Sequence, residues 1–434
     1  MKDTVNIFWF RRDLRLDDNV GFYNALKSEH PVLPIFIFDE EILKKLPKDD
    51  ARITFIYETL QKMRTKLKDK NSSSIAMFHG EPAVVYKNLL EKYNIDTVFT
   101  NRDYEPYAKE RDGKIEQLLN DNTIKFKTFK DQVIFEQNEV TKKDGLPYVV
   151  YTPYMKVWKE QFKTYTLDFY YTSSFLKNLI QDKELPNLTL SDIGFTKSNQ
   201  KIKKHIVTPA LIQNYEDTRN FPAQDATSKL GPHLRFGTVS IRKMIEKAIT
   251  EKNEIFWQEL IWREFFMQIL WHFPHTSKNS FKAKYDRIDW RNNEAEFLKW
   301  CNGETGYPLV DAGMRQLNET GFMHNRIRML VGSFLCKHLL IDWRWGEAYF
   351  AEKLHDYEMA SNIGNWQWVA GSGVDAAPYF RIFNPTTQIK KFDSDLAYIK
   401  KWVPDFQEFT YPKEMVDHKE ARERCLATYK EALN

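Results

Sequence analysis

Residues that could bind a flat molecule with a polar edge gather near the end of the sequence, at positions 355–393. This stretch combines two acids, Asp356 and Glu358, with several small residues and with Trp366 and Trp368. Glycine and serine let a backbone approach a ligand closely, and tryptophan offers a large surface that must be buried or stacked. Acids in such surroundings are costly unless they meet hydrogen-bond donors. A loop with packed aromatic side chains explains each feature alone, but their density favours a binding pocket.

Two earlier segments could supply further walls of this pocket. The hydroxyl-rich turn Thr227–Gly231 suits a phosphate group, because its backbone N–H groups, hydroxyls and lysine are donors; an ordinary helix N-cap is the simpler explanation. On a helix predicted for residues 253–271, Glu259, Trp262 and Arg263 share one face. These residues form either an ion pair inside a buried helix or the lining of a cavity.

A third segment, predicted as a helix over residues 325–340, carries two arginines near its start. Arg328 could pair with Asp356 if the two segments meet, and Arg326 could reach a phosphate. Charges on an exposed helix surface are the alternative. Three tryptophans in separate segments are most simply core residues: Trp290, Trp343 and Trp366.

Composition narrows the classes of protein to consider. The 434 residues carry a net charge of +4, which permits nucleic-acid binding without requiring it. Three widely spaced cysteines without a CxxC pair disfavour a zinc site or a disulfide framework. We therefore expect no metal site and a reducing, cytoplasmic location. The N-terminus lacks the apolar core of a signal peptide, and no run of about 18 apolar residues predicts a membrane span.

Hydrophobic periodicity predicts an α/β region over residues 1–128. Strands and helices alternate there, which indicates a parallel, Rossmann-like sheet with helices on both faces. The G-x-G-x-x-G motif is absent after the first strand, which disfavours a standard dinucleotide site. The charged cluster at residues 11–18 is either a solvated loop with local ion pairs or the lip of a ligand crevice. The predicted strands are 5–10, 32–38, 75–78, 97–100 and 124–128, and the predicted helices are 52–67, 82–93 and 105–119.

The rest of the chain is predicted to form a connector and an all-α domain. Residues 129–200 are rich in polar residues and proline, which is typical of a connector, with local helix near Tyr154–Lys163. Helical periodicity dominates residues 201–434. The predicted helices of this domain are 209–218, 240–251, 253–271, 294–303, 308–321, 325–340 and 345–355.

Taken together, these motifs resemble the photolyase/cryptochrome family over nearly the whole chain. The opening FWFRRDLRLDDN is similar to the first strand and loop of that family, and ELIWREF, MHNRIRM and ASNIGNWQWVAGSGVDAAPYFRIFNPTTQ follow in the same order. The resemblance implies an N-terminal α/β antenna domain and a helical domain that binds FAD. It further implies light-driven repair of cyclobutane pyrimidine dimers in DNA by electron transfer from excited FADH⁻ to a flipped-out dimer. We therefore expect a photo-lyase, a monomer whose partner is UV-damaged DNA.

The resemblance also assigns roles to individual residues. Asn362 would face the N5 atom of the flavin, and Trp366, Trp343 and Trp290 would form an electron-transfer chain outward from it. Glu259 would hydrogen-bond a base edge. Residues implied to bind FAD are Tyr215, Thr227, Ser228, Lys229, Leu230, Gly231, Trp257, Arg263, Arg328, Asp356, Tyr357, Glu358 and Asn362. Residues implied to face damaged DNA are Glu259, Trp262, Asn325, Arg326, Met329, Trp368 and Gln388.

The subclass is argued from single positions. The (6-4) photolyases have two histidines where this chain has Asn325 and Met329, which favours class I cyclobutane-dimer repair. Plant-type cryptochromes commonly carry aspartate at the position of Asn362, so a blue-light receptor without repair activity is the alternative. An electron-transfer flavoprotein unrelated to DNA is a third hypothesis, supported only by the tryptophan content.

Three features depart from the family pattern. Gly231 replaces the last serine of the T-S-x-L-S phosphate turn, which removes one hydroxyl, and Glu358 stands where aspartate is common. The segment Asn101–Asp112 lacks the Asn–Glu pair expected of members that bind a folate antenna. It is closer to deazaflavin-type members, and the identity of a second antenna chromophore is left open.

Overall fold

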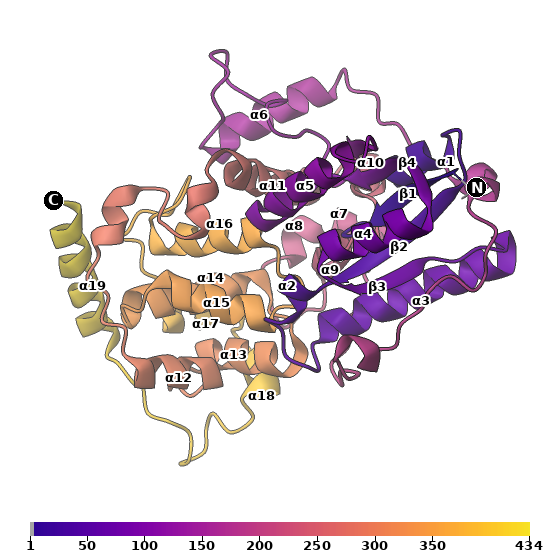
Figure 1. The fold of residues 1–434 in the computed structure, drawn as a ribbon. Coiled ribbons are helices and arrows are strands. Elements are labelled where there is room, and N and C mark those ends of the chain that lie inside the picture. The colour runs from indigo at the N-terminus through magenta and orange to yellow at the C-terminus, as the bar shows by residue number, and fades with distance from the viewer. Residues whose placement is uncertain (1–3) are drawn as a thin grey trace. The chain divides into compact units, whose positions relative to one another are not determined.

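The computed structural model describes residues 4–434, whose contacts divide the chain into two compact units (Figure 1). Unit 1 comprises the chain up to Glu136, Gln161–Lys203 and Leu230–Lys247, and unit 2 comprises Gln137–Glu160, Lys204–Lys229 and Ala248–Asn434. The predicted connector is therefore not a separate body: its residues are shared between the units. Part of the predicted all-α domain, residues 230–247, also belongs to unit 1.

Unit 1 is built on a five-stranded parallel sheet in the order β3-β2-β1-β4-β5. Chain order runs outward from β1 in both directions, which is the doubly wound arrangement predicted from the alternating elements. The strands coincide with the short apolar runs of the sequence. Their bounds are β1 (Thr4–Phe10), β2 (Val32–Asp39), β3 (Ala76–Gly80), β4 (Asn94–Asn101) and β5 (Lys125–Phe129).

Helices cover both faces of this sheet, because alternate side chains of each strand point to opposite faces. Phe8 and Phe10 of β1 pack into the core that contains α1 and α3, whereas Ile7 and Trp9 pack into the core that contains α4 and α5. The helices of unit 1 are α1 (Val20–Leu26), α2 (Glu40–Leu43), α3 (Ala51–Asn71), α4 (Pro82–Lys92), α5 (Pro106–Asn120), the 3-10 helices η1 (Ser173–Asn178) and η2 (Ser191–Ile193), α9 (Gly231–Arg235) and α10 (Ile241–Thr250), which ends just beyond the unit boundary.

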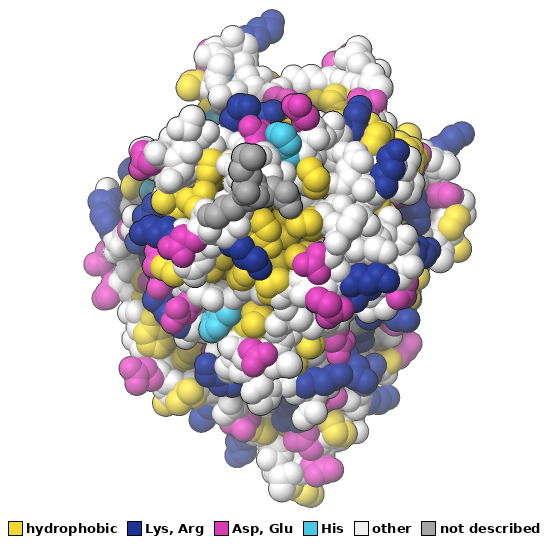
Figure 2. Space-filling view, turned by 45° about the vertical axis from the view of Figure 1, so that its right-hand side comes forward, with side chains coloured by type: hydrophobic (Ala, Val, Ile, Leu, Met, Phe, Trp, Pro, Cys, Tyr) yellow, Lys and Arg dark blue, Asp and Glu magenta, His cyan; other side chains and the backbone are white. Residues whose placement is uncertain are grey.

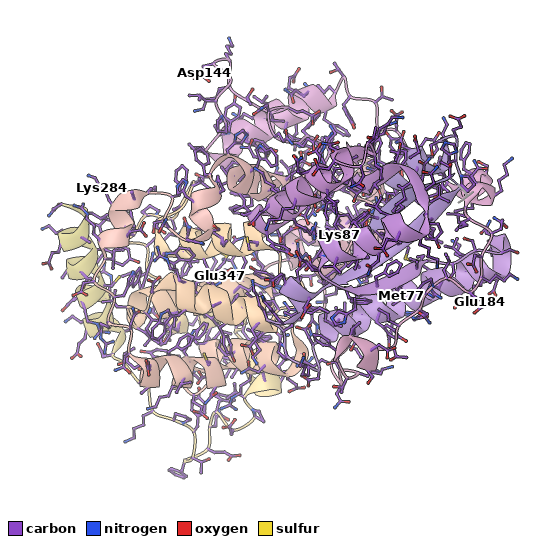
Figure 3. All side chains as sticks on the ribbon, in the orientation of Figure 1. Met77, Lys87, Asp144, Glu184, Lys284 and Glu347 are labelled. Carbon is purple, nitrogen blue, oxygen red and sulfur yellow. The ribbon has the colours of Figure 1, made fainter. Side chains whose placement is uncertain are left out.

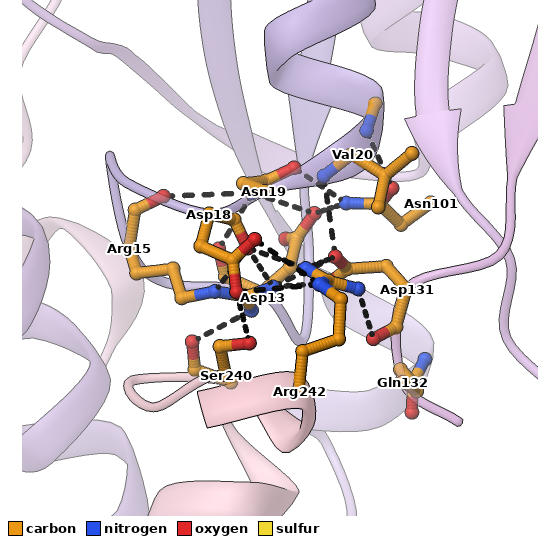
Figure 4. Close-up of polar contacts among 12 residues, drawn as sticks. Asp13, Arg15, Asp18, Asn19, Val20, Asn101, Asp131, Gln132, Ser240 and Arg242 are labelled. Atoms are coloured by element: carbon orange, nitrogen blue, oxygen red, sulfur yellow. Dashed lines mark hydrogen bonds and ion pairs between the residues drawn. The ribbon is translucent and has the colours of Figure 1, made fainter. Parts of the chain in front are cut away.

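A buried polar network follows β1 and binds the C-terminal segment of unit 1 to the sheet (Figure 4). The fully buried carboxylate of Asp18 accepts from Arg242 Nε at 3.1 Å and from the hydroxyl of Ser240. Asp131 accepts from Arg15 at 2.7 Å and from Arg242 at 2.9 Å. Burial alone would raise the pKa of Asp131, but the two guanidinium groups lower it below its ordinary value.

The rest of the charged cluster at residues 11–18 is also paired. Arg11 contacts the carboxylate of Asp112, and Arg12 contacts Asp103 at 2.9 Å. Both arginine side chains are almost completely buried. The interpretation as a solvated loop with local ion pairs is therefore incomplete: Asp17 does form a surface pair, with Lys243, but the pairs of Arg11 and Arg12 are buried, and the partners in all three pairs are distant in sequence.

Unit 2 is almost entirely helical, as predicted. In its central layer α16 packs against α11, α14 and α15, and α13 packs against α12, α14 and α18 (Figure 1). Its helices are α6 (Tyr151–Phe162), α7 (Pro209–Gln213), α8 (Tyr215–Thr218), α11 (Glu254–His272), η3 (Pro274–Ser277), η4 (Ala283–Arg287), α12 (Glu294–Asn302), α13 (Pro308–Thr320), α14 (Asn325–Ser333), η5 (Phe334–His338), α15 (Trp343–Lys353), α16 (Met359–Ala370), α17 (Pro385–Phe392), α18 (Ala397–Trp402) and α19 (His418–Leu433).

Local signals fix where the helices around the candidate pocket begin and end. The Asp342 carboxylate accepts from Arg344 N, so α15 begins at Trp343 rather than at the predicted residue 345. Gly371, with φ of 91°, ends α16. No helix was predicted over residues 359–370, which form α16. The predicted helix 325–340 is α14 followed by the π-helical turn η5.

On the face drawn in Figure 2, basic and acidic side chains are interspersed. Among residues 4–434, no helix combines the length and apolar character of a membrane span. The same residues contain no group of three or more His, Cys, Asp and Glu side chains able to hold a metal ion.

His338 is buried in the π-helical turn η5, and we therefore expect the folded protein to lose stability in acid. His338 Nε2 lies 2.9 Å from His418 Nδ1, and burial, helped by the charge of His418, lowers the pKa of His338 to about 3. Between this value and the unfolded value of about 6.5, the unfolded chain binds more protons, so stability falls as pH falls. From pH 7 to pH 5 this histidine should remove about 2 kcal/mol of the free energy of unfolding.

Urea unfolding at the two pH values checks this prediction. The loss of stability between pH 7 and pH 5 should be smaller in His338→Gln than in wild type. The exposed His275 supplies a control, His275→Gln, in which the loss should match wild type. An unchanged loss in His338→Gln would contradict the prediction.

Candidate functional site

One cavity in unit 2 opens between α14, α15 and α16 and has a volume of about 590 Å³, including the part open to solvent. Its floor is apolar, formed by residues such as Phe350, Leu354 and Val369, and its rim is polar. Nine residues predicted from the sequence line it: Asn325, Arg328, Met329, Asp356, Tyr357, Glu358, Asn362, Trp366 and Trp368.

Helical spacing brings these side chains to one place. Asn325, Arg328 and Met329 lie within one turn at the start of α14, as the i, i+3, i+4 pattern predicts. Asn362 and Trp366 are four residues apart on α16 and are buried, with 9% and 3% of their surface exposed. The segment between α15 and α16 contributes the acids.

Two ion pairs organise the rim of the cavity. Arg328 donates to Asp356 Oδ2 at 2.8 Å, which confirms the predicted pairing of the two segments. Arg263 of α11 lies 3.2 Å from Glu358, so its acidic partner is not Glu259. The second oxygen of Asp356, Oδ1, is buried and accepts no hydrogen bond from the described residues. A buried acceptor of this kind at the edge of a cavity suits a ligand that brings a donor.

The residues predicted to face DNA on α11 are held by two side chains that the sequence did not single out. Glu259 pairs with Arg219, one turn after Tyr215, and Trp262 is stacked on Tyr151 of α6 with ring centroids 3.5 Å apart. Tyr151 lies in the region interpreted as a connector. The only signal in the sequence was the aromatic periodicity of residues 151, 154 and 158, which all face inward.

The hydroxyl-rich turn is divided by the unit boundary. In unit 2, Lys229 donates to Thr227 Oγ1 at 2.7 Å, pairs with Asp225 at 2.8 Å and has φ of 55°. The carbonyl of Ser228 accepts from Ile206 N. Leu230 and Gly231 begin the short helix α9 of unit 1.

Two aromatic residues predicted to line the cofactor site have different surroundings. Tyr215 packs edge-on against Phe256 with centroids 5.2 Å apart. Trp257 instead lies against Trp158 and Lys159 of α6, and it is not among the residues that line the cavity. Its predicted role as a cofactor contact gains no support from this position.

The three tryptophans of the predicted electron-transfer chain lie in unit 2. Trp366 contacts Phe350 and the completely buried Trp300, with centroids 5.0 and 6.2 Å away. Trp343 is buried at the start of α15, and Trp290 is half-buried against Tyr429, 6.0 Å between centroids. Trp300 was not singled out from the sequence, which contains twelve tryptophans and no spacing that distinguishes this one.

The last two predicted DNA contacts are on α14 and α17. Arg326 lies over the ring of Phe392, 4.3 Å from its centroid, and donates to Asn220. Gln388 is half-buried on α17 and does not line the cavity. Burial lowers the pKa of Arg326 below its ordinary value, and the positive charge of Arg219 adds to this effect.

Comparisons with known proteins identify the family. Residues 6–170 match the DNA photolyase model, and residues 256–410 match the model of the FAD binding domain of DNA photolyase. The deoxyribodipyrimidine photo-lyase of Agrobacterium fabrum is 36% identical over 99% of this chain and 98% of its own length. The chain belongs to the DNA photolyase family. The deoxyribodipyrimidine photo-lyase of a Synechococcus species is 35% identical over 94% of this chain and 90% of its own length.

Solved structures of the photolyase family have the same architecture. A bacterial class III photolyase from Agrobacterium tumefaciens has a TM-score of 0.87 and 32% identity, covering 100% of this chain and 98% of that one. An archaeal photolyase from Sulfolobus tokodaii with two FAD molecules has a TM-score of 0.81 and 33% identity, covering 98% of this chain and 100% of that one. The assignment to class I, made from Asn325 and Met329, is not tested by these similarities and stays a prediction.

The residues of this photolyase-family chain fit FAD. An apolar floor suits an isoalloxazine ring, and the rim offers both acceptors and donors. A flavin nucleotide carries N–H groups, carbonyls and phosphates. Asp356 Oδ1 can accept a hydrogen bond from an N–H group, and the guanidinium groups of Arg263 and Arg328 can donate to carbonyls or phosphates.

Proposed function

We propose that this protein repairs cyclobutane pyrimidine dimers in DNA with light, using FAD bound in the cavity between α14, α15 and α16. The observation that carries the proposal is that one cavity is lined both by residues assigned to the cofactor, such as Asn362, and by residues assigned to the lesion, such as Met329 and Trp368. An electron donor and its acceptor bound there would lie in adjacent parts of one cavity. The named relatives support the same chemistry.

FAD, when bound, supplies light absorption and one-electron donation. The protein would hold it through Arg328, Asp356, Arg263 and Glu358, whose paired charges can stay buried because each meets an opposite charge. Asn362 would address the ring itself. These residues bind and orient the cofactor, and none of them needs to gain or lose a proton in repair.

The lesion would enter from the duplex by rotating out of the base stack. A damaged pair stacks and pairs poorly, so this rotation costs less than it does for intact DNA. Trp262 and Trp368 would provide the apolar wall, with Trp262 already held flat by Tyr151. Arg326 would contact a phosphate, and this contact should weaken with salt.

A repair assay tests the proposal. Purified protein with chemically reduced FAD should restore thymines in dimer-containing DNA under blue light and not in the dark. Absence of repair, combined with equal affinity for damaged and intact DNA at fixed salt, would instead indicate a light receptor. An absorption spectrum of the purified protein would report bound flavin and any second chromophore.

Glu259 is predicted to be needed for lesion binding and not for FAD binding. Glu259→Ala should raise the Kd for dimer-containing DNA roughly tenfold or more, because a charged hydrogen bond is worth about 1.5–3 kcal/mol and Arg219 loses its partner. Binding is measured by fluorescence anisotropy in the dark, with flavin absorbance recorded on the same samples. Glu254→Ala is the matched control, because Glu254 is exposed on the same helix. Loss of flavin from Glu259→Ala would show a structural role instead.

A further inference from the structure

Tyr151 is the first residue of α6, the helix that follows the loop carrying Asp144 (Figure 3). Its side chain is buried, with 5% of the residue exposed. The phenol ring lies almost parallel to the indole of Trp262 on α11, at an interplanar angle of 8°. Because the ring centroids are only 3.5 Å apart, the two rings face each other over most of their area.

The hydroxyl of Tyr151 fixes where this ring lies along α11. It donates to the backbone carbonyl of Gln258 at 2.8 Å. Gln258 precedes Trp262 by about one helical turn, so the hydrogen bond and the stacked rings hold the same stretch of the helix. Burial raises the pKa of Tyr151 above its ordinary value, and the negative charge of Glu259 acts in the same direction. The hydroxyl therefore keeps its proton and remains a donor at neutral pH.

The backbone of Tyr151 is bound to the segment that follows α16. Its N–H donates to Asp375 Oδ2 at 3.2 Å. The first N–H groups of a helix have no partner within the helix, and an acid at that end is favourable. Asp375 follows the helix that ends at Ala370 and carries Trp368. Tyr151 thus connects the segment after one residue assigned to the lesion wall, Trp368, with the other, Trp262.

Stacking on Tyr151 orders the indole of Trp262 before DNA binds. A half-buried tryptophan without such a neighbour would populate several rotamers, and binding would have to select one of them. Ordering one side chain on binding lowers affinity roughly two- to tenfold. In this protein one face of the indole is already covered by a ring that is itself held by two hydrogen bonds.

We infer that Tyr151 is a positioning residue for lesion recognition, which holds the Trp262 indole in the orientation that a flipped-out pyrimidine dimer meets. Its effect on the dimer is exerted through Trp262, so it sets the affinity for damaged DNA and not the electron transfer that follows. This inference rests on the assignment of Trp262 to the lesion made in the proposed function.

Binding of dimer-containing and intact DNA in the dark tests the role of Tyr151. Tyr151→Leu removes the flat ring and should weaken binding of damaged DNA roughly five- to tenfold, with little change for intact DNA, which does not reach Trp262. At saturating damaged DNA, pre-reduced Tyr151→Leu should repair within about twofold of the wild-type rate. Tyr151→Phe keeps the ring and should retain the wild-type preference within about twofold.

Two controls separate positioning from general stability, with flavin absorbance recorded on every sample. Phe162→Leu removes a half-buried ring at the other end of α6, where it contacts Tyr165, and should leave the preference for damaged DNA unchanged. Tyr151→Met fills a similar volume without a flat ring and gives the same test if Tyr151→Leu does not retain flavin.

A double-mutant cycle shows whether Tyr151 acts through Trp262. In a Trp262→Leu background, Tyr151→Leu should cause no further loss of preference, because the ring that it holds is absent. A further loss as large as in wild type would overturn the inference, as would an unchanged preference in Tyr151→Leu alone. Equal affinity of the wild type for damaged and intact DNA would instead overturn the proposed function, and this inference with it.

Discussion

The Trp366→Phe variant is expected to reduce its bound FAD under blue light about tenfold more slowly than wild type, or slower still, a change of about 1.4 kcal/mol or more in activation free energy. Phenylalanine preserves the aromatic contact with Phe350 but is far harder to oxidise than tryptophan. Repair by enzyme reduced chemically beforehand should change little, because the role proposed for Trp366 is to supply electrons to the flavin and not to transfer them to the lesion. Absorbance changes under illumination with an external reductant give the first rate, and dimer loss gives the second.

The neighbouring Trp368 provides the control for this experiment. Trp368 lies two residues further along α16 and is half-buried at the cavity. Trp368→Phe should photoreduce at the wild-type rate and bind dimer-containing DNA less tightly. If Trp366→Phe lost photoreduction and repair by pre-reduced enzyme to the same extent, its assigned role would be wrong.

Replacing Asp18 with asparagine is expected to destabilise unit 1 by about 3 kcal/mol or more. The change leaves the buried guanidinium of Arg242 with one carboxylate, that of Asp131, instead of two. The two carboxylate oxygens of Asp18 also accept hydrogen bonds from the Ser240 hydroxyl and from Tyr170 N. The side chain of asparagine has only one oxygen to accept both. Asparagine is chosen because Asp18 has φ of 49°, a conformation that asparagine tolerates better than alanine.

Urea unfolding followed by circular dichroism measures this loss. Asp17→Asn is the matched control, because the adjacent Asp17 pairs with Lys243 at the surface, where both side chains are more than a third exposed. Such pairs contribute about 1 kcal/mol or less. Similar destabilisation by the two substitutions would contradict the prediction, because the buried network around Asp18 would then contribute no more to stability than the surface pair of Asp17.

The sequence predicted the elements whose periodicity is strong. All five strands were found as short apolar runs, because strands of a parallel sheet are buried on both faces. Helices such as α3, α11 and α13 were found from the spacing of the apolar residues on their buried faces, but the long helix α19 (His418–Leu433) was not among the predicted helices. Residues 359–370 were missed as a helix. Ser361, Asn362, Gly364 and Asn365 are weak helix formers, and here packing against α11, α14 and α15 outweighs local propensity.

In the candidate site, a pair of interacting residues could be predicted where the two side chains carry opposite charges that need each other. Pairs that only the fold brings together could not be predicted. Arg328 and Asp356 could be paired in advance because each is a charge that needs an opposite one. Arg219 and Glu347 could not, because exposed and buried charged residues are alike in sequence and only folding brings them to Glu259 and Asn362. The assignment of residues to flavin or lesion came from family resemblance and not from spacing.

The packing of Trp366 has a consequence for the speed of electron transfer. A Cβ atom at Gly346 of α15 would overlap the indole, and one at Gly332 of α14 would lie 3.5 Å from it. The ring is therefore held by the backbones of two helices, which cannot rotate away as side chains can. Surroundings this stiff give a small reorganisation energy when the ring loses an electron. In the electron-transfer role proposed for Trp366, the rate should then be governed by distance and driving force, with no conformational gate.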